Sequence, residues 1–303
     1  MATHPLRIEW PTVAIAAACT GVWMAATWAA GRDGPWPLLA LAALCVTLHS
    51  SLQHEALHGH PTRSRLLNEA LVFPAPGLFI PYRRFKTLHL KHHNDPILTD
   101  PYEDPETNYM AKADWDRLPR AVQAVRVFNN TLVGRLIIGP AIAVIGFALS
   151  ELRLLAAGDR RIWLAWLLHA GGVAMTLGWA LGVCGLGFWT YLLTVAYPGF
   201  SLLMIRTFLE HRAEREVPER TCIVEDASGL WGLLFLNNNL HVVHHLEPAV
   251  AWYRLPALYA RDRVHFRSVN GGYGFPSYWT VMRRYAFRSK SPVPHPFMRH
   301  DGA

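Results

Sequence analysis

The sequence has little charge and little cysteine, and both shortages narrow what the protein can be. Only 17% of its 303 residues are charged and 51% are hydrophobic, whereas soluble domains carry about a quarter charged residues. Its four cysteines form no CxxC pair, which argues against a disulfide framework, a cysteine zinc site or a fused iron–sulfur domain. An ordinary soluble domain is excluded. The mean hydropathy of only +0.13 indicates that apolar spans alternate with a large polar portion.

Charge is absent altogether from three stretches of 22, 21 and 44 residues. About 20 helical residues cross the core of a bilayer, so these stretches predict one, one and two spans. The turn of the second pair falls at Cys184–Gly187, near the middle of the longest stretch. The result is an all-α membrane protein with two helical hairpins, whose spans lie at about residues 10–31, 34–54, 162–183 and 186–206.

A shorter uncharged run at residues 136–150 contains Pro140 and predicts a buried or interfacial helix rather than a span. With four spans and a cytoplasmic N-terminus, 28 of the 29 Lys and Arg residues lie on the cytoplasmic side, as the positive-inside rule requires. We therefore expect one integral membrane domain over residues 1–303. Both termini and a cap formed by residues 55–161 and 207–303 are expected to be cytoplasmic.

The net charge of +7 needs no nucleic-acid partner, because the positive-inside bias and attraction to anionic lipid headgroups explain it. Histidine is the abundant chemistry-bearing residue. Eight of 16 histidines form an HxxxH box at residues 54–58 and HxxHH boxes at residues 89–93 and 241–245. Residues three or four apart share a helix face, whereas adjacent residues diverge by about 100°, so each HxxHH box can reach two metals.

The ligand type limits the metal. Imidazoles without cysteine suit iron, zinc, copper or nickel. Three or four histidines complete a zinc site, so eight are too many for one ion and about right for two. Beside a membrane, two irons indicate O2 chemistry on an unactivated C–H bond, which zinc does not perform because it has no redox chemistry.

The order HxxxH, HxxHH, HxxHH resembles the membrane-bound di-iron fatty acid desaturases and their hydroxylase and ketolase relatives. The Asp104-Pro105-Glu106 segment after the second box and the stretch from His244 to Pro256 also look like that family. The resemblance implies a four-span helical body under a cytoplasmic cap, and iron ligands at the eight box histidines. The resemblance also implies a further ligand at His211, which lies between the last span and the third box, where the family has an extra iron ligand. The implied ligands are His54, His58, His89, His92, His93, His211, His241, His244 and His245.

Metal-bound imidazoles usually donate their second N–H to a carboxylate or a carbonyl. Residues next to the boxes are candidates for this supporting role, although for each of them a solvated surface position or a helix cap is the plain alternative. These candidates are His49, His60, Glu55, Asp95, Asp104, Glu210, Asn237, Asn238 and Glu247. Beyond the metal ligands, the sequence indicates no further catalytic residue.

The function expected from the resemblance is O2-dependent oxidation of a lipid C–H bond, with desaturation of a fatty acyl chain as the first choice. Hydroxylation or ketone formation on a fatty acyl, sphingoid or carotenoid-like substrate is the alternative among enzymes. A histidine-rich metal transporter is the alternative from another class, but transporters place their ligands inside the spans. No electron-transfer domain is visible, so an external ferredoxin-like or cytochrome donor is implied.

Overall fold

The computed structural model describes residues 8–94, 98–215, 220–226 and 229–297, and helices dominate them. The chain forms two compact units. Unit 1 comprises residues 1–86, 141–203 and 234–236, and unit 2 comprises the rest, with boundaries inside the helices α4, α8, α11 and α12. The expected all-α, membrane-type fold is confirmed, apart from one pair of short strands.

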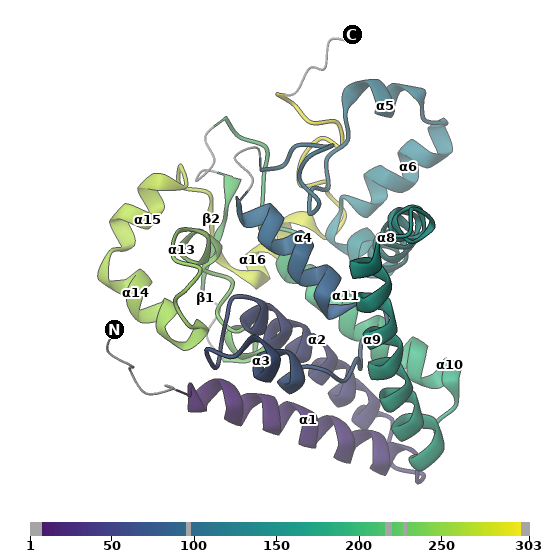
Figure 1. Ribbon diagram of the computed structural model, residues 1–303. Helices are drawn as coiled ribbons and strands as arrows, with labels where there is room; N and C mark the ends of the chain where they lie inside the picture. Colours follow the sequence, from purple (N-terminus) through teal and green to yellow (C-terminus); the bar gives the residue numbers. More distant parts are fainter. Residues whose placement is uncertain (1–7, 95–97, 216–219, 227–228, 298–303) are drawn as a thin grey trace. The chain divides into compact units, whose positions relative to one another are not determined.

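The hairpin of α1 (Trp10–Ala30) and α2 (Pro37–Leu57) forms one side of unit 1, and the two helices lie next to each other (Figure 1). Each begins with a proline in its first turn, where a missing N–H costs no hydrogen bond. The backbone of Gly199 packs tightly on α2, because an added Cβ there would lie 2.5 Å from the Val46 Cβ. Thr47 Oγ1 donates to the Gly199 carbonyl at 2.7 Å. This contact holds α2 against the last long apolar helix.

Among the described residues, four helices are long and apolar enough to cross a membrane: Trp10–Ala30 (α1), Gly139–Ala156 (α8), Arg160–Val183 (α9 and η1) and Phe188–Thr207 (α10, η2 and α11). The number matches the prediction, but the membership differs. The predicted span at residues 34–54 is not among them, because α2 carries polar residues such as His49, Gln53 and Glu55 in its C-terminal half. The predicted interfacial run is a longer apolar helix than its uncharged part implied, since α8 continues past Glu151.

The second long hairpin is irregular within its helices. It consists of α9 (Arg160–Leu177), the π-helix η1 (Gly178–Val183), α10 (Phe188–Tyr191), the π-helix η2 (Leu192–Ala196) and α11 (Tyr197–Thr207). Its turn lies at Cys184–Gly187, where the sequence predicted it, and Gly185 there has φ 77°, a conformation that glycine adopts freely.

The short helix α3 (Arg65–Leu71) is capped by Ser64, whose side chain accepts from the Leu67 N–H.

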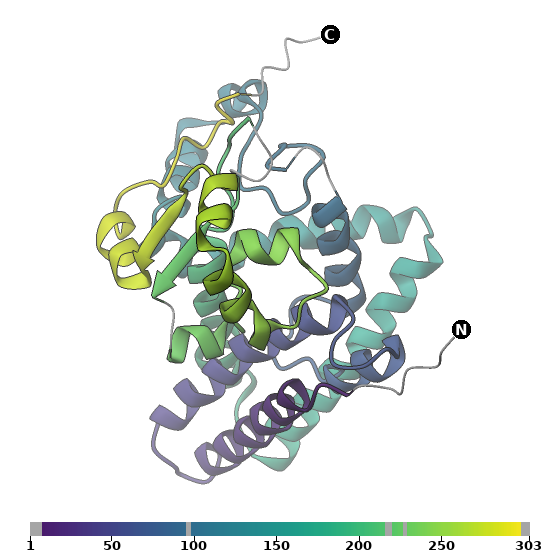
Figure 2. The ribbon, with the colours of Figure 1, turned by 90° about the vertical axis from the view of Figure 1, so that its left-hand side faces the viewer.

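Unit 2 holds the remaining short helices around a two-stranded parallel sheet, β1 (Ile223–Asp226) and β2 (Gly274–Ser277). Figure 2 shows the two strands as adjacent green and yellow arrows. The other elements of this unit are the C-terminal part of α4 (Tyr82–Asn94), α5 (Lys112–Arg117), α6 (Arg120–Asn129), α7 (Leu132–Ile137), α12 (Leu230–Leu234), α13 (His241–Leu246), the 3-10 helix η4 (Trp252–Arg254), α14 (Leu255–Arg261), α15 (Arg263–Val269) and α16 (Tyr278–Tyr285).

The third histidine box is part of the hydrophobic core of unit 2. Val242 and Val243, inside the box, are fully buried and pack in one cluster with Ile223 of β1, Leu255 of α14 and Phe266 of α15. Burial of these side chains provides roughly 1.5 kcal/mol or more each. The two valines therefore anchor α13 in the core, while the histidines of the same short helix face another direction.

Candidate metal centre

Four histidines of unit 2 converge on one point. His92 comes from α4, His211 follows α11, and His241 and His245 lie four residues apart on α13. One nitrogen of each lies within 4.8 Å of the others. The Nε2 of His211 is 3.0 Å from the Nε2 of His92 and 3.0 Å from the Nε2 of His241. Four imidazole nitrogens at this spacing form a ready ligand set for a metal that accepts nitrogen ligands.

Buried polar groups orient two of these rings from behind. His92 Nδ1 is 2.8 Å from Asp104 Oδ1, and His241 Nδ1 is 3.0 Å from Asn238 Oδ1. Asp104 is itself fixed, since its Oδ2 accepts the Thr99 N–H at 2.8 Å. A carboxylate or amide oxygen that accepts from Nδ1 directs the Nε2 lone pair towards the centre of the group.

The electrostatics of this group favour a bound cation. Burial, with the neighbouring imidazoles, holds the pKa values of His211, His241 and His245 well below 6.5, so these rings are neutral and offer lone pairs. Burial also opposes the charge on His92, but Glu106 and Asp104 outweigh it and raise its pKa to about 9. These carboxylates therefore favour positive charge at this point, and a metal ion has to displace the proton of His92 to bind there. The Nε2 of His245 is buried with no hydrogen-bond partner among the described residues. A metal ion would satisfy that nitrogen, so these residues fit one.

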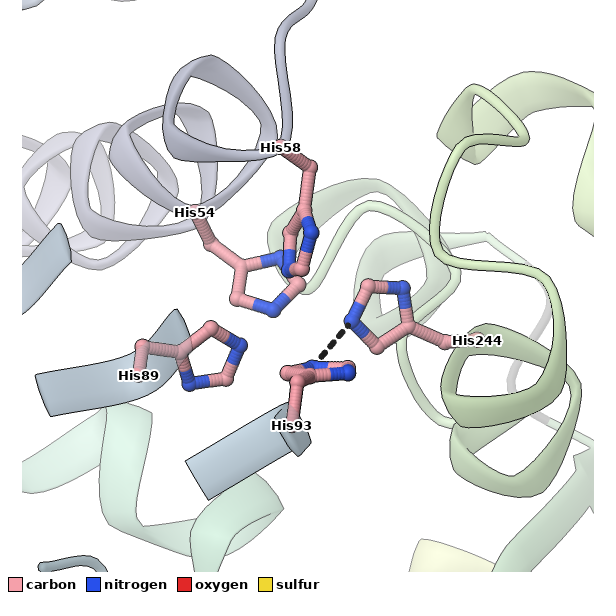
Figure 3. A group of neighbouring side chains, drawn as sticks. All are labelled: His54, His58, His89, His93 and His244. Carbon is pink, nitrogen blue, oxygen red and sulfur yellow. Dashed lines mark hydrogen bonds between the residues drawn. The ribbon is translucent and has the colours of Figure 1, made fainter. Parts of the chain in front are cut away.

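Three further histidines of unit 2 form a second group. His89 and His93 of α4 have ring centroids 4.6 Å apart, and His93 Nε2 lies 3.1 Å from His244 Nε2. Figure 3 shows these three rings facing one another, with the dashed line between His93 and His244. The adjacent residues of each HxxHH box thus belong to different groups. His92 and His245 lie in the first group, whereas His93 and His244 lie in the second.

The HxxxH box belongs to unit 1. His54 and His58, four residues apart at the C-terminal end of α2, have ring centroids 4.9 Å apart (Figure 3). His54 is fully buried, and its Nδ1 is 4.0 Å from the carboxylate of Glu55, which is buried too. The pairing of these two rings on one face is what their spacing predicts.

The remaining candidate supports have varied positions. His60 pairs with Glu9 at 2.8 Å and so fastens the start of α1, and Asn237 donates to the Trp252 carbonyl. Glu210 forms a buried ion pair with Arg206 at 2.8 Å, with its Oε1 3.7 Å from His241 Nδ1. The other three are Glu247, exposed at the end of α13, His49, which lines a cavity in unit 1, and Asp95, which lies outside the described residues.

The sequence match now decides the family. The family model "Fatty acid desaturase" matches residues 33–276, which include all three boxes. The chain belongs to the fatty acid desaturase family. No curated protein matches it. Membership makes this desaturase-family protein a membrane-associated oxidoreductase of the desaturase/hydroxylase superfamily that acts on lipid, and its histidine groups suit the metal binding known for that family.

Two supports of this desaturase-family site were not among the sequence candidates. Glu106 accepts a hydrogen bond from His89 Nδ1 at 2.8 Å. Burial would raise the pKa of this carboxyl, but the adjoining His89 and His92 hold it well below its usual range. Only its position two residues after Asp104 signals this role.

The second such support is the C-terminal segment. Lys290, half-buried beside the ring of Phe208, donates from Nζ to the carbonyl of His211 at 2.7 Å. Nearby, Thr99 Oγ1 and His295 Nε2 are 3.1 Å apart, and Thr99 also donates to Asp104. Thr99 has φ 72°, a strained conformation for a β-branched residue, of the kind that surrounding contacts must hold in place. The C-terminal segment thus contacts His211 directly and His92 through Thr99 and Asp104. No sequence pattern predicts these contacts.

Replacing Asp104 with asparagine is expected to weaken metal binding by roughly 10- to 100-fold. An amide has one acceptor oxygen, so the variant cannot serve both His92 Nδ1 and the Thr99 N–H as Asp104 does. Chelator titration of the purified, iron-loaded protein measures the change. Asp116→Asn, at an exposed surface position, is the matched control and should behave as wild type. Equal iron retention in the two variants would contradict the supporting role of Asp104.

Proposed function

We propose that this protein uses two irons and O2 to desaturate a fatty acyl chain. The observation that carries the proposal is the convergence of His92, His211, His241 and His245 on one point in unit 2, next to a second group that shares both HxxHH boxes. Two irons bound there would supply the activation of O2 and the oxidation of an unactivated C–H bond, which zinc does not.

The proposed division of ligands gives each iron its own set. His92, His211, His241 and His245 hold one iron, and His89, His93 and His244 contribute to the other. The family match proposes His54 and His58 of the HxxxH box as further ligands. Support for this division comes from the HxxHH spacing, whose adjacent residues point about 100° apart. Support for His54 and His58 comes from their shared face on α2 and from the family match.

The chain's own residues hold and orient the ligands. Asp104, Glu106 and Asn238 fix three rings through their Nδ1 atoms, so that the Nε2 atoms are left to serve as the ligating atoms. Burial keeps water away and keeps His211, His241 and His245 neutral. Rigid placement of this kind is what allows one C–H bond of a bound chain to be selected over its neighbours.

The proposed topology follows from the ligand group of unit 2. His92 and His211 lie together there, so the chain between them crosses the membrane an even number of times. Three apolar helices lie in that interval. We infer that the hairpin of residues 160–207 crosses and that α8 stays at the cytoplasmic interface. With α1 and α2 as the other hairpin, both termini and the histidines are cytoplasmic, the side that holds nearly all Lys and Arg residues.

Single cysteines test this topology. Lys112→Cys and Asp159→Cys lie before and after α8 at exposed positions, and all four native cysteines are buried. We expect a membrane-impermeant thiol reagent to label both variants only when it is given access to the cytoplasmic face. Labelling of the two from opposite faces would show that α8 crosses.

The reaction itself is tested by comparing lipid extracts of cells with and without the protein by mass spectrometry. Desaturation removes two hydrogens from a product lipid, which is the expected result. Gain of one oxygen would assign hydroxylation instead. If the lipids stay unchanged in the presence of a competent ferredoxin-like or cytochrome donor while metal uptake by the cells changes, the alternative of a histidine-rich metal transporter is favoured.

A further inference from the structure

A cavity in unit 1 lies on α2 just before the HxxxH box. Its volume is about 70 Å³, which is room for a small polar group such as a hydroxyl or an amide but not for a whole lipid. Apolar side chains of α2, α11 and the 75–80 loop form most of its wall, and four polar side chains interrupt it: His49, Ser50, Gln53 and His169. Polar groups cost free energy in an apolar wall unless they find a hydrogen-bond partner.

His49 is the most informative of the four, because it is buried with one nitrogen unused. Its side chain is hydrogen-bonded to the backbone of Val72, and its Nε2 has no partner among the described residues. The Val72 N–H already donates to the Glu69 carbonyl, so the imidazole donates to the Val72 carbonyl through Nδ1. A neutral ring then leaves Nε2 as an acceptor. The group that completes this site must donate a hydrogen bond.

The cavity adjoins the first histidine box along the same helix face. Ser50 lies four residues before His54, which in turn lies four before His58, so the three share one stripe of α2. His49 is five residues from His54, about 8 Å along the helix axis. A group bound in the cavity is therefore separated from the first box by only a short segment of lipid.

We propose that this cavity binds a hydrogen-bond donor of the lipid substrate, a hydroxyl or an amide N–H, a short distance from the oxidised carbon. An unmodified methylene chain, or an ester with acceptors only, would bury His49 Nε2 without a partner. Sites built on such a hydrogen bond bind analogues that lack the donor less tightly, because the buried acceptor is then left unpaired. The substrate class is thus a lipid with a donor close to the reacting position. This inference rests on the proposed function, because it names the substrate of that reaction.

Equilibrium binding to the iron-loaded full chain in detergent micelles tests the proposal with two probes. Octadecan-1-ol carries the donor, and 1-methoxyoctadecane has the same oxygen without it. Wild type is expected to prefer the alcohol about fivefold, the size of one hydrogen bond. In His49→Phe the preference should fall below twofold while iron content stays unchanged. His265→Phe, at an exposed position, should keep the wild-type ratio.

A wild-type ratio near one, or an unchanged ratio in His49→Phe, would overturn the proposal. If His49→Phe fails to fold, the wild-type ratio still decides it, because both probes are compared within one protein. Binding needs no turnover, so the two hypotheses fail separately. Absence of lipid oxidation with the alcohol preference intact would refute the reaction and leave the cavity's ligand class standing.

Discussion

His241→Ala is expected to abolish lipid oxidation, reducing product by more than about 1000-fold, the loss of at least 4 kcal/mol of transition-state stabilisation. The substitution removes the Nε2 that lies 3.0 Å from His211 Nε2, and leaves three of the four nitrogens of that group. It also leaves Asn238 without the ring that it orients. Product in lipid extracts and iron per chain are the two measurements, and both should fall.

The control for this variant is His265→Ala, which removes an exposed imidazole from the same unit and should leave both measurements at wild-type values. Thermal unfolding in detergent separates loss of metal from loss of fold. A His241→Ala protein that keeps its unfolding midpoint, two irons and its product would show that this group does not hold a catalytic metal.

Glu151→Leu is expected to destabilise the protein by about 3–5 kcal/mol, because it leaves the Arg84 guanidinium buried without its counter-charge. Two hydrogen bonds of 2.8 Å join these side chains, and both residues are buried. Trp166 Nε1 also loses its acceptor on Glu151. The unfolding midpoint in detergent should drop accordingly.

The double variant Arg84→Met/Glu151→Leu should recover most of that loss, because removing both charges also removes their desolvation cost. Arg83→Met is the matched control on the neighbouring residue. Its ion pair with Glu69 is partly exposed, with 36% of the Arg83 side chain accessible, so the expected cost is below about 1 kcal/mol. Equal destabilisation by Glu151→Leu and Arg83→Met would contradict the importance of the buried pair.

Short-range patterns made much of this site predictable. Side chains three or four residues apart share a helix face, so the boxes gathered their histidines as the spacing required, and His211 joined one group. Counting uncharged residues was less reliable for predicting apolar helices where a stretch was close to the length of one membrane span. Polar residues reduced the hydropathy of α2, and α8 extended past Glu151 because Arg84 neutralises that charge inside the fold. A pairing between residues so distant in sequence leaves no local pattern.

The residues that support the metal ligands were likewise only partly predictable from the sequence. Asp104 and Asn238 were predicted from their closeness to the boxes, and both contact a box histidine. His60 was predicted by the same reasoning, yet pairs with Glu9, because closeness along the chain does not fix the direction of a side chain. Lys290 and Thr99 act through contacts between distant parts of the chain, which only the folded structure brings together.

Elemental analysis with iron-57 Mössbauer spectroscopy of the purified full chain tests directly whether the histidines hold two irons. We expect about two irons per chain, with spectra of a nitrogen-ligated, magnetically coupled pair. One iron per chain, uncoupled irons, or zinc in place of iron in protein that oxidises lipid would contradict it.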